Sequence, residues 1–115
     1  MNDAGGWLVA CLCAEWCGAC REYRAVFDAA RGANPAARFA WVDIEDHPDV
    51  LGAIDVENFP SLMIARGDDI AFFGTVTPHA STLNALVDSA MLGELGAVGD
   101  TELHGVPARI RALPT

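Results

Sequence analysis

All four cysteines of the chain lie within ten residues, in the stretch "CLCAEWCGAC" from Cys11 to Cys20. Clustered thiols can hold a metal ion, form a structural disulfide, or exchange electrons through a disulfide that opens and closes. Each of these uses predicts a different kind of protein. The spacing of the cysteines and the elements that carry them distinguish the three possibilities.

Cys17 and Cys20 have C-x-x-C spacing and stand where an apolar run ends and a helical pattern begins. The unpaired N–H groups and the positive dipole at the start of a helix stabilise a thiolate. Such a position lowers the pKa of a thiol below its usual value of about 8.5. Cys20 would sit underneath Cys17, and a disulfide between them closes a small ring that opens without refolding the chain. Gly18 and Ala19 are small enough to admit a partner disulfide, so the pattern predicts an electron-exchange site.

The composition favours a single soluble domain of the cytoplasm. The chain has 115 residues, 52% of them hydrophobic, which is enough for one core. No apolar run approaches the roughly 20 residues of a membrane-spanning helix, and the N-terminus is a poor secretory signal. Structural disulfides are rare in the cytoplasm, and four clustered cysteines could join nothing distant. The net charge of −9 argues against a nucleic-acid partner.

Apolar patterning predicts the elements that position the cysteine pair. A continuous apolar run is typical of a strand buried on both faces, and apolar residues at helical spacing indicate an amphipathic helix. A glycine-containing turn between two apolar runs indicates a hairpin. The expected elements are a strand over 7–14, a helix over 17–33, a strand over 37–45, a short helix over 46–54, a hairpin over 61–74 and a helix over 79–92.

This order predicts an α/β fold with a four-stranded mixed sheet and helices on both faces. The first strand–helix–strand unit should be a parallel crossover, and the hairpin should add an antiparallel edge. Glycines recur and periodicity fades from Gly93 onward. We therefore expect a domain over 1–92 and a flexible C-terminal tail over 93–115, with a short interacting segment around Val106–Leu113.

The motifs together resemble the thioredoxin family. "AEWCGAC" after an apolar strand, "FPS" before the hairpin, and the order of elements carry the resemblance, which covers residues 7 to about 91. The resemblance implies a thioredoxin-like three-layer sandwich and disulfide reduction by dithiol exchange. It also implies protein disulfides as substrates and another protein as electron donor. The cysteine pair itself would carry the electrons, and no nicotinamide, flavin or other cofactor is expected.

The resemblance also implies a role for each matching residue. Cys17 would attack the disulfide of a partner, and Cys20 would resolve the mixed disulfide. Pro60, expected to be cis, would keep the backbone of Phe59 open for pairing with a partner peptide. The expected binding surface comprises Trp16, Gly18, Ala19, Phe59, Pro60 and Gly74.

The sequence departs from the family pattern within the motif and beneath it. Ala19 stands where the family usually has a proline. Cys11 stands where the family carries a buried aspartate that helps to deprotonate the resolving thiol. Cys13 takes a tryptophan position, and Trp41 takes the position of the lysine that partners the aspartate.

Without the buried acid, Cys20 should be harder to deprotonate in a dry interior. We therefore expect slower turnover than in a full thioredoxin, or reliance on Glu15 or Asp43 through water. Cys11 and Cys13 should point to the same face of a strand, where they are interpreted as small buried groups. An auxiliary redox pair and a metal site with Cys17 and Cys20 are the alternatives, but no second ligand pair has zinc-finger spacing.

The chain also resembles a short form that lacks the family's N-terminal strand and helix. The strand over 38–45 would then have an open edge, through which a homodimer could form. A second possible function is a binding or chaperone-like module with weak redox activity, favoured by this edge and by the segment "GVPARIRALPT". The three histidines, including His47, show no neighbours in the sequence that would indicate a ligand or a base.

Overall fold

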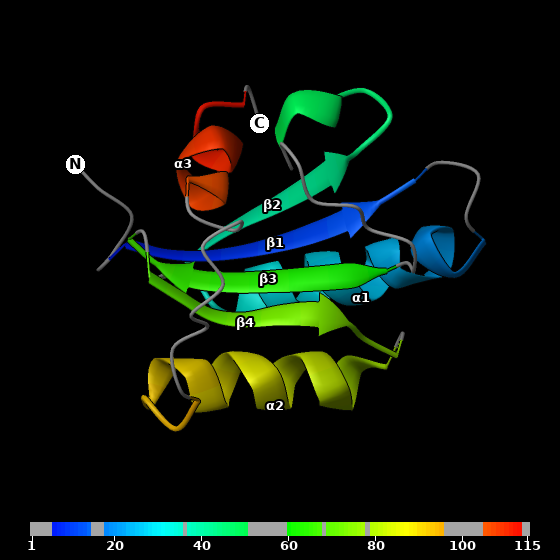
Figure 1. Cartoon of the computed structure of the whole chain (residues 1–115). Coiled ribbons are helices and arrows are strands. Elements are labelled where there is room, and N and C mark those ends of the chain that lie inside the picture. The colour runs from blue at the N-terminus through cyan, green and yellow to red at the C-terminus, as the bar shows by residue number, and fades with distance from the viewer. Residues whose placement is uncertain are drawn as a thin grey trace.

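The computed structural model describes residues 6–14, 18–35, 37–50, 60–67, 69–77, 79–95 and 105–113. Figure 1 shows how the elements in these ranges are arranged. In chain order they are β1 (Trp7–Cys13), α1 (Gly18–Ala33), β2 (Arg38–Asp43), the 3-10 helix η2 (Pro48–Val50), β3 (Ser61–Arg66), β4 (Asp69–Thr75), α2 (Ala80–Met91) and α3 (Val106–Arg111).

The strands form a mixed sheet in the order β2-β1-β3-β4. β1 pairs in parallel with β2, which the chain reaches through α1, and β1 pairs antiparallel with β3. β3 and β4 form a hairpin whose turn includes Gly67 at φ 59°, a left-handed conformation that suits glycine. The predicted α/β class, four-stranded mixed sheet and parallel crossover are confirmed.

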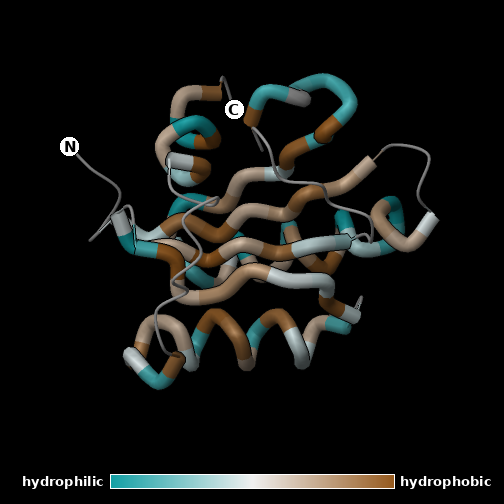
Figure 2. The backbone as a smooth tube through the Cα atoms, in the orientation of Figure 1, coloured by the Kyte–Doolittle hydropathy of each residue, from teal (hydrophilic) through white to brown (hydrophobic). Residues whose placement is uncertain are grey.

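One face of the sheet, which we call the thiol face, is covered by α1 and α2. Alternation along β1 directs Val9, Cys11 and Cys13 to this side, where they join one buried apolar cluster. Figure 2 shows apolar residues along the strands and, on α2, apolar residues alternating with polar ones. The other buried members of this cluster are Cys20, Tyr23, Phe27, Ala30, Ala37, Phe39, Leu62, Ile64, Val76, Leu83, Val87 and Ala90.

The other face of the sheet, which we call the opposite face, is covered by α3 (Figure 1). Val106 and Ile110 of α3 are fully buried against apolar side chains of the strands and Val50 of η2. The Nε of Arg109 donates to the carbonyl of Val50 at 2.7 Å. The guanidinium of Arg111 donates to the carbonyl of Gly67 at 2.6 Å and also to that of Gly6. These contacts join the C-terminal helix to the main body of the fold.

The segment around Val106–Leu113, expected to interact, is therefore a helix whose side chains form part of the core. Residues 96–104, 114 and 115 lie outside the described residues, and the division of the chain after residue 92 stays a prediction. Because α3 covers the opposite face, deleting 93–115 would expose a core cluster. Such a deletion would not be a clean test of whether this segment binds a partner, because it would also damage the core.

Two further elements differ in extent from their predictions. The second strand ends at Asp43, because the chain turns there: the Asp43 carbonyl accepts from the N–H groups of Asp46 (3.2 Å) and His47 (3.0 Å). The short helix is a single 3-10 turn over Pro48–Val50, and 51–59 lie outside the described residues. None of the helices in the described part of the chain is long and apolar enough to cross a membrane.

Candidate active site

The described part of the C-x-x-C motif forms the first turn of α1. Gly18 is exposed, Ala19 is half-buried and Cys20 is only 1% exposed, facing the thiol-face cluster. Trp16 and Cys17 lie outside the described residues, as does Glu15. The structure thus places Cys20 inside the fold, as expected for a thiol shielded from solvent beneath the start of a helix.

Strand pairing arranges the residues of β1 and β2 in a row beneath α1. Cys11 lies opposite Trp41 and Cys13 lies opposite Asp43, and paired residues of neighbouring strands share a face. The sulfurs of Cys11 and Cys13 are 3.3 Å apart, and both side chains are buried. The prediction that these two cysteines share one buried face is confirmed.

Cys11 and Trp41, which the resemblance places at the family's aspartate and lysine positions, lie opposite each other on β1 and β2. The ring of Trp41 packs edge-on against Phe27 at 5.6 Å between ring centres. The guanidinium of Arg24 lies 4.9 Å from the centre of the Trp41 ring. Cys11 is completely buried beside this aromatic contact. No acid therefore occupies the interior of the described thiol face.

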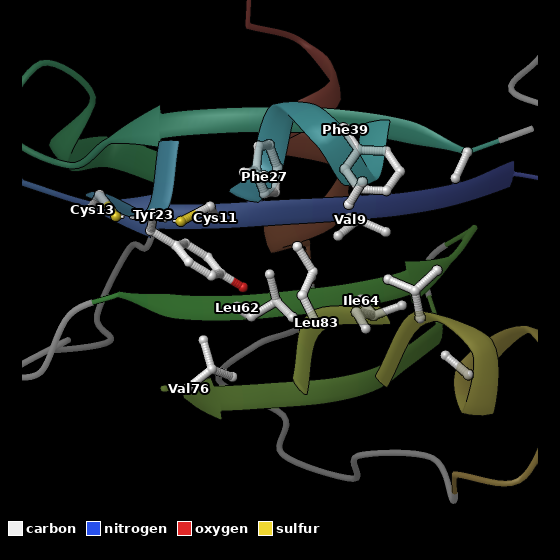
Figure 3. Close-up of a cluster of buried hydrophobic side chains, with 14 of the residues drawn as sticks. Val9, Cys11, Cys13, Tyr23, Phe27, Phe39, Leu62, Ile64, Val76 and Leu83 are labelled. Atoms are coloured by element: carbon white, nitrogen blue, oxygen red, sulfur yellow. Dashed lines mark hydrogen bonds between the residues drawn. The ribbon is translucent and has the colours of Figure 1, made fainter. Parts of the chain in front are cut away.

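The buried phenol of Tyr23 is a feature that sequence reasoning missed. Figure 3 shows its ring beside Cys11 and Cys13 with its hydroxyl directed toward Leu62. The Tyr23 oxygen is buried and has no hydrogen-bond partner among the described residues. Burial, and then the proximity of Cys11 and of Cys13, raises the pKa of Tyr23 well above its usual 10.0. Helical spacing indicated that Tyr23 is buried but not that its hydroxyl lacks a partner.

A cavity of about 540 Å³ opens where the ends of β1 and β2 meet the first turns of α1. Asp43, one of the two acids on which Cys20 was expected to rely through water, lines this cavity together with Cys20. His47 also lines this cavity, although its neighbours in the sequence gave no indication of a site. A turn that reverses the chain after Asp43 brings it there. The cavity is lined by Cys13, Ala14, Cys20, Arg21, Arg24, Trp41, Asp43, Asp46 and His47.

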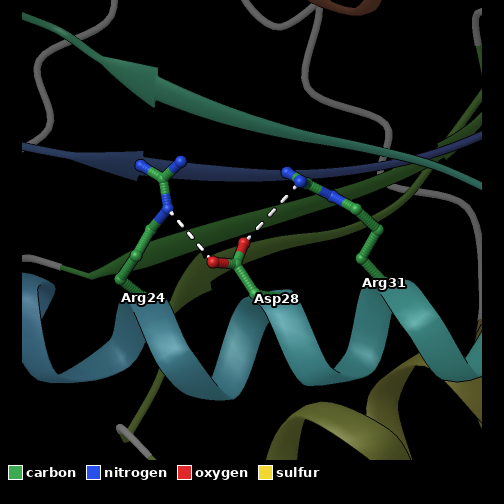
Figure 4. A network of polar contacts seen from close by, with 3 residues as sticks. All are labelled: Arg24, Asp28 and Arg31. Atoms are coloured by element: carbon green, nitrogen blue, oxygen red, sulfur yellow. Dashed lines mark ion pairs between the residues drawn. The ribbon is translucent and has the colours of Figure 1, made fainter.

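On the outer side of α1, Arg24 also belongs to a polar chain on the helix surface. Figure 4 shows Asp28 between Arg24 and Arg31, with N–O distances of 3.6 Å and 3.7 Å. All three side chains are about half-exposed, so these ion pairs contribute little to stability. Their effect is to hold the Arg24 side chain along the helix, where it reaches Trp41 at the wall of the cavity.

Pro60 and Gly74, two further predicted site residues, lie at the same end of the sheet. Ser61 pairs with Leu12 near the end of β1, so the buried Pro60 lies at the end that carries Cys20. The Pro60 carbonyl accepts from Val76 N at 3.0 Å, which joins the start of β3 to the end of β4. Gly74, half-buried, pairs with Leu62 in this hairpin. Phe59 and the peptide bond that precedes Pro60 lie outside the described residues, so the cis isomer stays a prediction.

The sheet and its C-x-x-C helix define a thioredoxin-like fold. Residues 2–89 match the Thioredoxin family, so the chain belongs to the thioredoxin family. A curated protein of Streptomyces coelicolor that carries the name thioredoxin 2 is 39% identical over 75 residues. This alignment covers 65% of the chain and 54% of that protein, so the chain spans about half the length of its curated relative.

Solved structures show the same fold at low sequence identity. Thioredoxin from Trypanosoma brucei brucei has a TM-score of 0.68 at 20% identity, covering 78% of this chain and 79% of that one. Thioredoxin from Fasciola hepatica has a TM-score of 0.66 at 20% identity, covering 73% and 80% respectively. These structures support the fold class.

Proposed function

We propose that the protein is a thiol–disulfide oxidoreductase that reduces disulfides of partner proteins through Cys17 and Cys20. The observation that carries the proposal is the position of Cys20, buried in the first turn of a helix that directly follows Cys17 in a family-matching motif. A buried resolving thiol is protected from outside oxidants and reacts with the neighbouring sulfur. This arrangement supports exchange within the pair rather than at isolated cysteines.

In the proposed cycle, the thiolate of Cys17 attacks a sulfur of the partner disulfide, and one partner thiolate leaves. Cys20 then loses its proton and attacks the Cys17 sulfur, which breaks the mixed disulfide and releases the second partner thiolate. The pair is oxidised to a disulfide, and the partner disulfide is reduced to two thiols. A protein electron donor would return two electrons to the pair.

The binding surface for the partner would lie around the described Gly18, Pro60 and Gly74, at one end of the sheet. A Cβ added at Gly74 would lie 3.5 Å from the Phe72 ring, an ordinary contact, so the site tolerates a small side chain there. With Trp16, Ala19 and Phe59, these residues would form the predicted contact surface.

We place the protein in the cytoplasm. β2 is one of the two edge strands of the described sheet and could pair with a second copy.

Reaction with an aromatic disulfide such as dithiobis(nitrobenzoate) tests the proposal. Attack by Cys17 releases a first coloured nitrothiolate, and resolution by Cys20 releases a second in a separate kinetic phase. In Cys20→Ser the first phase should remain and the label should stay on the protein. In Cys17→Ser both phases should disappear, while Cys13→Ala serves as a control for loss of another cysteine in the cluster. Retention of both phases in Cys17→Ser would contradict the proposal.

A binding or chaperone-like module remains the second candidate function, because the interior of the thiol face carries Cys11 and Trp41 instead of an acid–base pair. This function predicts that the wild-type protein shows the first kinetic phase without the second. It also predicts that a partner stays bound when both Cys17 and Cys20 are replaced by serine, since binding would not need the thiols.

A further inference from the structure

The surroundings of Cys20 raise the question of where its proton goes. Thiol–disulfide exchange needs the thiolate, so a buried thiol requires a proton acceptor before it can attack. The buried hydroxyl groups among the described residues are those of Tyr23 and Ser61, and no described carboxylate or imidazole is buried. An acceptor within the described part of the chain must therefore reach Cys20 from a wetter place.

The cavity at the ends of β1 and β2 is such a place, since Cys20 forms part of its wall. Its volume of about 540 Å³ accommodates several water molecules. Asp43 and His47 are half-buried on the wall, whereas Asp46 is exposed. The titratable or charged groups facing the cavity are Cys13 from β1, Cys20, Arg21 and Arg24 from α1, Asp43 from β2, and Asp46 and His47 from the turn after it.

Among these groups, the carboxylate of Asp43 is the one held in place on the thiol face. Pairing with Cys13 puts Asp43 on the face that α1 covers. The turn after Asp43 is joined to β1 by the N–H of Ile44, which donates to the Cys13 carbonyl at 3.0 Å. The Oδ1 atom accepts from the N–H of Glu45 at 2.9 Å, which fixes the orientation of the carboxylate.

We propose that Asp43 is the proton acceptor of Cys20 and receives the proton through water in this cavity. The proposal rests on the proposed function, in which Cys20 resolves the mixed disulfide. The Cys20 thiol gives its proton through water to the Asp43 carboxylate, and the resulting thiolate attacks the Cys17 sulfur. The bond between Cys17 and the partner sulfur breaks, the Cys17–Cys20 bond forms, and the partner leaves as a thiolate. Asp43 then returns the proton to solvent.

Replacing Asp43 distinguishes the loss of a proton acceptor from the loss of a negative charge near Cys20. A carboxylate near a thiol disfavours the thiolate, so removing the charge alone should make Cys20 easier to ionise and speed its attack. Loss of a proton acceptor should slow the same step. The two explanations therefore predict changes of opposite sign in the rate of the second kinetic phase.

The test compares the two phases of reaction with dithiobis(nitrobenzoate) in the full chain and in Asp43→Asn. The second phase should slow by about tenfold or more near neutral pH, toward the range of about 10²–10⁴-fold found for general acid–base groups. The first phase should not change. The second-phase rate of the variant should rise with pH and approach the wild-type rate as hydroxide takes over as acceptor. Asp43→Glu should restore most of the rate.

Asp49→Asn is the matched control, because Asp49 is exposed on η2 and does not line the described cavity wall. It should leave both phases unchanged. An unchanged or faster second phase in Asp43→Asn would overturn the proposal. The proposal would also be overturned if the second phase slowed in His47→Gln but kept its wild-type rate in Asp43→Asn. The histidine would then be the better candidate for the proton acceptor. Absence of the second phase in the wild type would instead refute the proposed function, so the two failures are distinguishable.

Discussion

The two faces of the sheet are both buried, but the polar groups that they contain differ in kind. On the opposite face, the packing side chains are apolar, and the arginines of α3 donate to the backbone carbonyls of Val50, Gly67 and Gly6. On the thiol face, the interior includes cysteine sulfurs and the Tyr23 hydroxyl, which has no hydrogen-bond partner among the described residues.

Under the proposed function, the thiol face would carry the chemistry, whereas the opposite face would mainly provide stability. Buried polar atoms without partners cost free energy and are expected where a function requires them. The cavity that adjoins Cys20 also lies on the thiol-face side, at the row that ends in Asp43. Substitutions on the two faces should therefore affect stability and reactivity in different proportions.

The largest expected effect is that of Phe27→Ala on the thiol face. Phe27 is fully buried and lies against Phe39, at 5.3 Å, as well as against Tyr23 and Trp41. Truncation should lower the free energy of unfolding by about 3–5 kcal/mol, because transfer energy is lost and a cavity remains. Urea unfolding measures this change. The cavity should also expose Cys11 and Cys13, so alkylation of these thiols under native conditions should become faster.

Ile110→Ala tests the opposite face with a somewhat smaller effect. Ile110 is fully buried beneath α3, and its truncation should cost about 2–5 kcal/mol. The alkylation rates of Cys11 and Cys13 should stay near those of the wild type, because these residues lie on the other side of the sheet. If Ile110→Ala exposed the thiols as much as Phe27→Ala does, the proposed division between the two faces would be wrong.

The smallest expected effect on stability is that of Tyr23→Phe. This change removes a buried hydroxyl without a hydrogen-bond partner among the described residues, so it should be neutral or stabilise the fold by about 1 kcal/mol. Thermal unfolding near neutral pH measures the effect. A loss of several kcal/mol would show that the hydroxyl has a partner in the folded protein, and the contrast between the faces would then fail.

The same residue gives the stability a dependence on alkaline pH. Burial raises the pKa of Tyr23, so the folded protein keeps its proton where the unfolded chain loses it, above the ordinary value of 10.0. The contribution is complete below that pH and is lost as pH rises through the higher folded pKa. Because the chain has one tyrosine, tyrosinate absorbance should appear together with unfolding. Tyr23→Phe should reduce the alkaline loss of stability, whereas ionisation before unfolding would contradict the burial.

Much of the thiol face could be predicted from the sequence, because its elements follow from local periodicity. The apolar run at 7–14 and the helical spacing after Cys17 predicted the buried β1, the start of α1 and the shared face of Cys11 and Cys13. The cavity was harder to predict, because it depends on how the chain turns after Asp43. No local pattern shows that His47 returns toward Cys20.

The covering of the opposite face was also beyond local patterning. The short α3 is too brief to give a clear helical period, and its burial comes from tertiary contacts of Val106 and Ile110. Recurring glycines suggested a flexible tail, yet two arginines of α3 donate to carbonyls that are distant in the chain. Charge in a short segment does not show whether backbone acceptors will be available in the folded structure.

The most direct test of the central claim is an equilibrium redox titration against dithiothreitol and glutathione, with thiol trapping and peptide mapping at each point. The account predicts one two-electron couple that joins Cys17 and Cys20, while Cys11 and Cys13 remain trapped as thiols throughout. If no Cys17–Cys20 disulfide forms at any potential, or if the disulfide joins Cys11 and Cys13 instead, the assignment of the redox site to the start of α1 is contradicted.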